Sequence, residues 1–189
     1  MLFGFLRRRR EARDTTSARE RMMREVTAAH EKVEMLVRAQ TRMLDFFDSY
    51  DVSQLYDEEY FRLYLYGAYD AAIMAYGPTI RSKIGLPLIR VGLTKYLAEE
   101  LTDGDREDAE RGADAIVQEC LGLPDLATNR AVLEGGAEGL GIIGGKNVSD
   151  GRLLRRFGGE HEPAGQRQVD GFVAFVAKDE TRLRALRAR

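Results

Sequence analysis

Residues in the first quarter of the chain that suit a packed helix face recur at alternating steps of three and four. The positions are Met23, Val26, His30, Val33, Val37, Gln40, Leu44 and Phe47. This spacing is the heptad seam of a long α-helix that packs along its length. Ser17 and Glu20 form a capping box, which predicts that the helix begins near Ser17. The polar residues from Asp48 onward predict that it ends near Tyr50, after about 50 Å at ~1.5 Å per residue.

The seam has two possible partners, which the sequence leaves open. It can form a coiled coil with another chain, or it can pack on later helices of the same chain, because both arrangements bury the same face. The polar seam residues His30 and Gln40 would fix the helix register in a dimer. No second ligand stands at a metal-binding offset from His30, so we expect no metal or catalytic role for it. The expected interface residues are Val26, His30, Val33, Val37, Gln40, Leu44 and Phe47.

The segment from Tyr56 to Tyr76 is apolar around almost the whole circumference of a helix, which predicts a helix in the middle of a bundle. Asp70 lies within it, and a carboxylate there must be paired, protonated or turned outward. We expect a structural pairing with Arg62, two turns earlier, or with neighbouring tyrosine hydroxyls. The alternative is a functional polar pocket at Asp70.

The rest of the chain predicts further helices. The segment 79–101 is expected to be broken or kinked near Gly85 and Pro87, and Thr102 or Asp103 is expected to cap the next helix. That helix has an apolar face made of Ala109, Ala113, Ile116, Val117 and Cys120. Another helix follows Pro124 and is expected to dissolve into the glycines between 135 and 145.

No strand-type alternation persists, so we predict an all-α fold, a helical bundle of about five to six helices with a long N-terminal helix. Four parts are expected: a basic, apolar tail at 1–16, the bundle at 17–145, a Gly/Arg-rich loop at 146–167 and a C-terminal amphipathic helix at 168–189. The apolar side of that last helix comprises Val169, Phe172, Val173, Val176, Leu183 and Leu186.

The N-terminal tail combines apolar and basic residues in two consecutive groups. They are Leu2, Phe3, Phe5 and Leu6, followed by Arg7, Arg8, Arg9 and Arg10. This combination suits the boundary between acyl chains and anionic headgroups. The order is the reverse of a secretory signal, in which the charge comes first. The sequence leaves three interpretations open: a frayed end or one that packs on the chain's own bundle, contact with an anionic membrane surface, and contact with a protein or nucleic-acid partner.

Two motifs that suggest ligand binding fail on their context. Gly139, Gly141 and Gly144 match GxGxxG but close a helical stretch, whereas a dinucleotide site must follow a strand and open a helix. These glycines therefore predict close helix contact or a hinge. Asp103, Asp105 and Asp108 could suggest a calcium-binding loop, but the glycine and the glutamate that such a loop requires are not at the required positions. These residues fit the acidic first turn of a helix. Cys120 is the only cysteine. We expect no cofactor and no metal.

Charge is distributed unevenly along a chain whose formal net charge is −2. Both ends are basic, whereas the segment 99–114 has eight carboxylates against two arginines, which makes nucleic acid an unfavoured partner. We predict a non-enzymatic helical interaction protein, an adaptor, assembly factor or small subunit. We expect it in the cytoplasm, with a protein partner or a second copy, and at the membrane surface where its N-terminus binds. The alternative is a small-ligand enzyme or sensor with a pocket between Asp70 and the glycine run.

Overall fold

The computed structural model describes residues 2–46, 50–76, 78–145 and 151–158, and in these ranges the chain forms helices and no strand. The elements are α1 (Leu2–Phe46), α2 (Val52–Asp57), α3 (Glu59–Met74), α4 (Pro78–Glu100), α5 (Arg106–Gly122), the 3-10 helix η1 (Leu126–Thr128), α6 (Arg130–Ile143) and α7 (Arg152–Phe157). The prediction of an all-α bundle is confirmed. None of these helices combines the length and hydropathy that crossing a bilayer requires.

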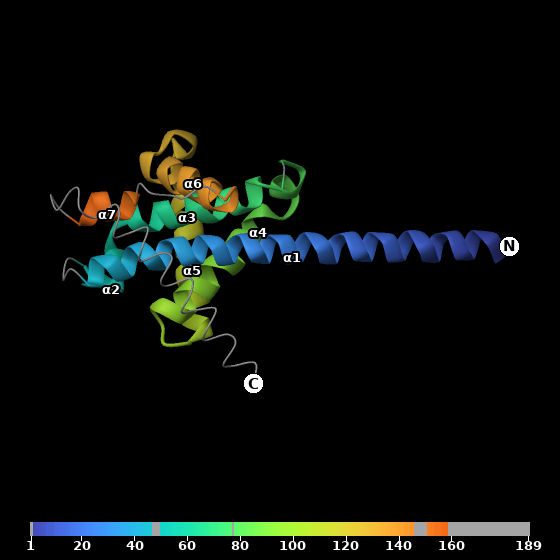
Figure 1. Ribbon diagram of the computed structural model, residues 1–189, viewed down its shortest axis with the longest axis horizontal. Helices are drawn as coiled ribbons and strands as arrows, with labels where there is room; N and C mark the ends of the chain where they lie inside the picture. The colour runs from blue at the N-terminus through green and yellow to red at the C-terminus, as the bar shows by residue number, and fades with distance from the viewer. Residues whose placement is uncertain (1, 47–49, 77, 146–150, 159–189) are drawn as a thin grey trace.

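Helix α3 forms the centre of the bundle, as its sequence predicts. It contacts α1, α2, α4, α5 and α6, and every residue from Leu63 to Ile73 is buried (Figure 1). The predicted apolar face of α5 is buried as well. It consists of Ala109, Ala113, Ile116, Val117 and Cys120. A helix that is apolar all round is stable only where other helices cover every side, and the five helices that contact α3 do so.

The closest packing in the fold is between α3 and α6, and it depends on glycine. A Cβ atom on Gly135 would lie 2.1 Å from the Tyr64 carbonyl oxygen, and one on Gly67 would lie 2.1 Å from the Val132 carbonyl oxygen. The two backbones are therefore in direct contact. The expectation of close helix contact is confirmed, but α6 does not dissolve at its glycines: it continues to Ile143, because contact with α3 offsets their low helix propensity.

Helix α4 is not broken at Pro87, and the predicted cap of α5 is wrong. Pro87 lies inside an uninterrupted helix, and the buried residues that follow it, Ile89 and Leu93, hold that helix against its neighbours despite the proline's cost of about 3 kcal/mol. The N-cap of α5 is Asp105 rather than Thr102 or Asp103. Its carboxylate accepts hydrogen bonds from the backbone N–H groups of Glu107 and Asp108.

Two further differences concern α1 and α7. Helix α1 begins at Leu2, so Ser17 and Glu20 lie inside it. The five arginines, Glu11 and Ala12 before Ser17 are good helix formers and continue the helix. The expected loop at 146–167 contains α7, whose first residues are held by side chains of α1 and α6. The predicted helix at 168–189 lies outside the described residues.

Candidate functional site

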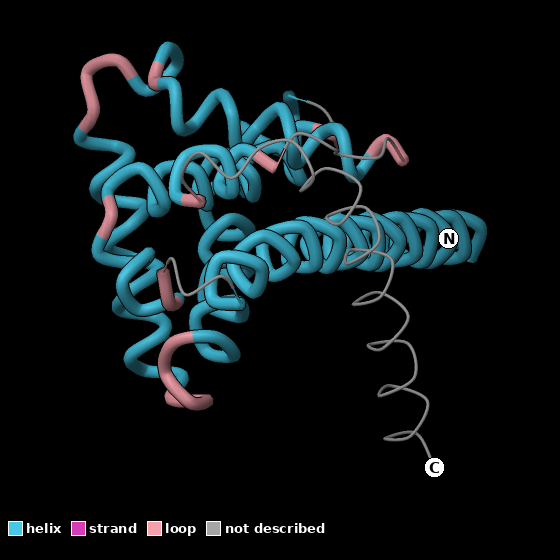
Figure 2. The backbone as a smooth tube through the Cα atoms, turned by 60° about the vertical axis from the view of Figure 1, so that its left-hand side comes forward, coloured by secondary structure: helices cyan, strands magenta, loops and turns pink. Residues whose placement is uncertain are grey.

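The N-terminal part of α1, residues 2–25, projects beyond the other helices, and we call it the arm (Figures 1 and 2). At ~1.5 Å per residue the arm is about 36 Å long. From Ser17 to Glu25 its side chains are exposed, apart from the half-buried Met22. We call the packed helices outside the arm the body. Helix α1 begins to pack on the body where the Tyr76 hydroxyl donates a hydrogen bond to the Glu25 carbonyl oxygen at 2.8 Å, and the next residue, Val26, is buried.

The residues that the sequence singled out for membrane or partner contact occupy the outer end of the arm. The apolar group from Leu2 to Leu6 comes first along the helix, and the basic group from Arg7 to Arg10 forms the next turn. A rod with apolar residues at its end and cations directly behind them matches the layered chemistry of an anionic lipid surface, which has acyl chains below charged headgroups.

The heptad seam of α1 is covered by the chain's own helices. Val26, Val33, Val37 and Leu44 are buried, and α1 contacts α3, α6 and α7. Met23, in the arm, stays exposed, and Phe47 lies outside the described residues. Of the two partners that the sequence left open, the chain itself is the one that buries this face, so the seam is not free to form a coiled coil with a second chain.

Five charged residues cluster between α1 and α4, and we call them the Arg38 cluster: Glu34, Arg38, Lys95, Glu99 and Glu100. Arg38 contacts Glu34 and Glu100, each at 2.7 Å, and also Glu99, while Lys95 lies 2.8 Å from Glu34. Burial raises the pKa of Glu34. Burial opposes the charge on Arg38, but its hydrogen bond to Glu99 and the surrounding carboxylates outweigh this and raise its pKa. The cluster fixes the register of α1 against α4.

His30 lies one turn before this cluster and is buried against Tyr69. The two rings meet edge to face, with centroids 5.4 Å apart. Within the described part of the chain, the His30 Nε2 atom and the Tyr69 hydroxyl have no hydrogen-bond partner. Burial, with a smaller effect of the Lys95 charge, lowers the pKa of His30 to about 4. The imidazole is therefore neutral at pH 7.

This pKa predicts a stability that depends on pH. Because His30 has a pKa of about 4 when folded and about 6.5 when unfolded, only the unfolded chain takes up a proton between these values. The free energy of unfolding should therefore fall as the pH falls below 6.5, by about 2 kcal/mol between pH 8 and pH 5 from this residue. Urea unfolding of the wild type and of His30→Phe at several pH values measures it. Equal pH slopes for the two proteins would rule out this contribution.

A second buried polar group joins four helices, and we call it the Glu138 network. Glu138 accepts hydrogen bonds from the Tyr64 hydroxyl, from Gln40 Nε2 at 3.1 Å and from the backbone N–H of Arg152 at 2.9 Å. Gln40 Nε2 also donates to the Tyr64 hydroxyl at 3.0 Å, and Gln40 Oε1 accepts from the Leu153 N–H at 3.0 Å. Burial, followed by the Glu138 charge, raises the pKa of Tyr64. The network attaches α7 to the bundle.

Asp70 is buried on α3, but the expected pairing with Arg62 is wrong. Arg62 instead forms a bidentate ion pair with Glu119 on α5, at 2.7 and 2.8 Å, and donates to two carbonyl oxygens at the end of α2. Between α3 and the glycine run, the backbones of α3 and α6 are in contact at Gly67 and Gly135, which leaves no room for a ligand at these two positions. In the described ranges, no group of acidic, histidine or cysteine side chains is arranged to hold a metal ion.

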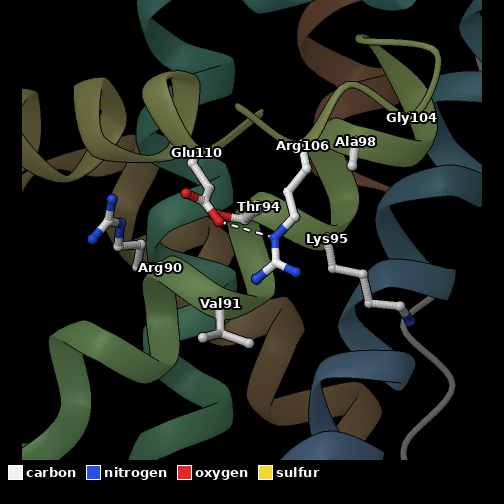
Figure 3. Close-up of a pocket in the computed structure, with 8 residues that line it drawn as sticks. All are labelled: Arg90, Val91, Thr94, Lys95, Ala98, Gly104, Arg106 and Glu110. Atoms are coloured by element: carbon white, nitrogen blue, oxygen red, sulfur yellow. Dashed lines mark hydrogen bonds and ion pairs between the residues drawn. The ribbon is translucent and has the colours of Figure 1, made fainter. Parts of the chain in front are cut away.

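A surface pocket of about 470 Å³ lies between α4 and α5 (Figure 3). Its three cations each have an acidic partner: Arg90 pairs with Asp114 at 2.5 Å, Lys95 with Glu34, and Arg106 with Glu110, one turn further along α5, at 3.0 Å. The surrounding segment 99–114 is strongly acidic. The charges that line the pocket are thus paired within the protein, and the pocket favours no class of charged ligand.

Comparison with protein families, with curated proteins and with solved structures finds no match to this chain.

Sequence reasoning missed the buried charged residues Glu34 and Arg38 of α1 and Glu138 of α6. From Val33 to Leu44, α1 is buried on nearly every side, including the polar Glu34, Arg38 and Thr41. The available signal was the second apolar series, Ala29, Leu36, Ala39 and Met43, which lies beside the seam and widens the buried arc. Glu138, in turn, is the single charged residue among the glycines of α6, a position that points to a specific partner.

Proposed function

We propose that this chain is a non-enzymatic helical interaction protein, an adaptor, assembly factor or small subunit, that holds its partner through the arm. The observation that carries the proposal is the contrast between the two parts of α1. From Val26 onward the helix is enclosed by the body, whereas from Ser17 to Glu25 it is exposed. A helix segment outside a bundle gains no tertiary packing, so a partner that covers it would supply the stabilisation that other helices obtain from the core.

The chemistry of the body supports binding over catalysis. Within the Arg38 cluster and within the Glu138 network the polar groups contact one another, and these contacts position α1, α4, α6 and α7. Burial raises the pKa of Cys120 to about 12, so this thiol is protonated at neutral pH and is a weak nucleophile. A rigid body with an anchored, projecting helix is an arrangement that serves to connect two partners.

The partner that best fits the outer end of the arm is an anionic membrane surface. Arginine contributes about 1 kcal/mol near such a surface, so Arg7 to Arg10 together give only a millimolar contact before the apolar residues add to it. The expected binding is therefore reversible and depends on salt, because charges at a surface are screened as the ionic strength rises.

Vesicle binding tests this proposal. Substituting Arg8→Gln together with Arg9→Gln should weaken binding to phosphatidylserine-containing vesicles by roughly 30-fold, because two arginines near an anionic surface contribute about 2 kcal/mol. Sedimentation with vesicles at low and at physiological salt measures the change. The matched control is Arg106→Gln with Arg111→Gln on α5, which removes the same charge from the body.

The control variant should bind vesicles as the wild type does. Equal vesicle binding by the wild type and by a chain lacking residues 2–16 would show that the outer end of the arm does not bind the membrane surface. If neither protein binds vesicles, the partner is a protein, and crosslinking from positions 17–25 should then capture one that the truncated chain does not hold. Failure of both assays would overturn the role of the arm.

A further inference from the structure

Helix α6 is apolar on its outer side as well as on its inner side. Its inner residues, among them Ala131, Gly135 and Gly139, pack on α3. Its exposed residues follow one another at steps of three and four and form a single stripe, which we call the outer face: Arg130, Leu133, Ala137, Leu140 and Gly144. The side chains of Leu133 and Leu140 are 54% and 44% exposed.

A helix on the surface of a soluble protein normally turns charged residues outward. In α6 the charged residues are Arg130, Glu134 and Glu138, and the first two pair with each other in the first turns. Glu138 is turned inward, where it holds the Glu138 network. The outer face from Leu133 to Gly144 is therefore without charge, so a segment that covers it would leave no charge buried without a partner.

The size of the outer face argues against a second copy of the chain. A helix of this length offers a strip about 20 Å long and 10 Å wide, roughly 200 Å², whereas a stable dimer buries about 800 Å² on each partner. A segment tethered to the same chain needs far less area, because its effective concentration is in the millimolar range and no second molecule has to be immobilised.

The chain supplies such a segment. Residues 168–189 lie outside the described residues, and their sequence predicts an amphipathic helix with Val169, Phe172 and Val176 on its apolar side. The connection to this segment starts close to α6, because it follows the short helix α7, whose first backbone N–H is bonded to Glu138 of α6. The ten residues from 159 to 168 span up to about 33 Å, which exceeds the length of about 20 Å of the outer face itself.

We propose that the outer face of α6, centred on Leu133, Ala137 and Leu140, is the docking site for the chain's own C-terminal segment 168–189. Apolar side chains of that segment cover Leu133 and Leu140, and the small Ala137 between them allows the two helices to approach closely. This intramolecular contact is independent of the arm and of its partner.

Hydrogen exchange of the full-length protein, followed by mass spectrometry, tests the proposal. Amides in 168–189 should exchange at least tenfold more slowly than those of the free peptide. Leu133→Lys and Leu140→Lys should each remove this protection. The matched control is Leu121→Lys on α5, an equally exposed leucine away from α6, which should leave it unchanged. Amides of α3 report on the fold, and light scattering reports on the oligomeric state.

Three results would overturn the proposal, and each can be told from the others. An unprotected C-terminal segment in the wild type would mean that it does not dock. If the segment is protected from exchange in the wild type and both lysine substitutions leave this protection unchanged, the segment docks elsewhere. A wild-type dimer that Leu133→Lys converts to a monomer would assign the outer face to a second copy.

Discussion

Replacing Gly135 by alanine should lower the free energy of unfolding by about 3 kcal/mol, at the upper end of the usual cost of overpacking. The added methyl group would lie 2.1 Å from the Tyr64 carbonyl oxygen, and a backbone atom in the central helix cannot move aside as a flexible side chain can. Helices α3 and α6 would have to separate. Urea unfolding followed by circular dichroism measures the loss, and thermal unfolding should show a midpoint lower by about 6 to 12 °C.

The neighbouring glycine provides the control. A Cβ atom on Gly136 would meet only the Gly67 carbonyl oxygen, at the ordinary contact distance of 3.6 Å. Gly136→Ala should therefore gain up to about 1 kcal/mol from the better helix propensity of alanine. Opposite signs at two adjacent positions of the same helix would establish that contact with α3, rather than local flexibility, requires the glycine. Similar effects of the two substitutions would contradict the backbone contact between α3 and α6.

The same glycines show what the sequence could and could not predict. Their number and spacing indicated close helix contact, which the structure confirms, because small residues have few other uses within a helix. The sequence also suggested that the helix would end at these glycines, because glycine has a low helix propensity and the sequence pattern does not show the contacts with other helices that can offset it. Contact of Gly135 and Gly139 with α3 outweighs this propensity, and it depends on residues about 70 positions earlier in the chain.

Boundaries were mispredicted for a related reason. The capping box of Ser17 and Glu20 is a valid local signal, but good helix formers on its N-terminal side allow α1 to continue past it to Leu2. Pro87 is a valid break signal, yet the buried residues after it keep α4 intact. By contrast, the apolar stripes of α1, α3 and α5 were identified correctly, because burial of a whole face involves many residues at once.

The polar sites were the least predictable part. Asp70 attracted attention as a carboxylate in an apolar helix, and Arg62 was assigned to it by its spacing, but Arg62 reaches across to Glu119 on another helix. Likewise, Gln40 was identified as a polar seam residue, whereas its partners Tyr64 and Glu138 lie 24 and 98 residues further along. Partners separated this far in sequence leave no local spacing to detect.

Replacing Glu138 by alanine should cost about 3 kcal/mol of stability, because buried hydrogen bonds to a charged acceptor contribute strongly and donors left without an acceptor carry the desolvation penalty. The substitution removes the acceptor of the Tyr64 hydroxyl, of Gln40 Nε2 and of the Arg152 N–H. The last bond attaches α7, so this helix should be released before the bundle unfolds. Hydrogen exchange should show the amides of Arg152 and Leu153 losing at least tenfold protection, while those of α5 keep theirs.

Two further variants separate the network from a general loss of charge. Glu138→Gln retains one carbonyl acceptor and most of the side-chain volume, so it should cost about half as much as Glu138→Ala. Glu110→Ala removes a carboxylate whose pair with Arg106 is largely exposed, and exposed ion pairs contribute less than about 1 kcal/mol, so it should leave α7 protected. If Glu138→Ala lowered global stability without exposing the amides of α7, the carboxylate would stabilise the contact of α1 with α6 alone, and α7 would be held by Leu153 and its apolar neighbours.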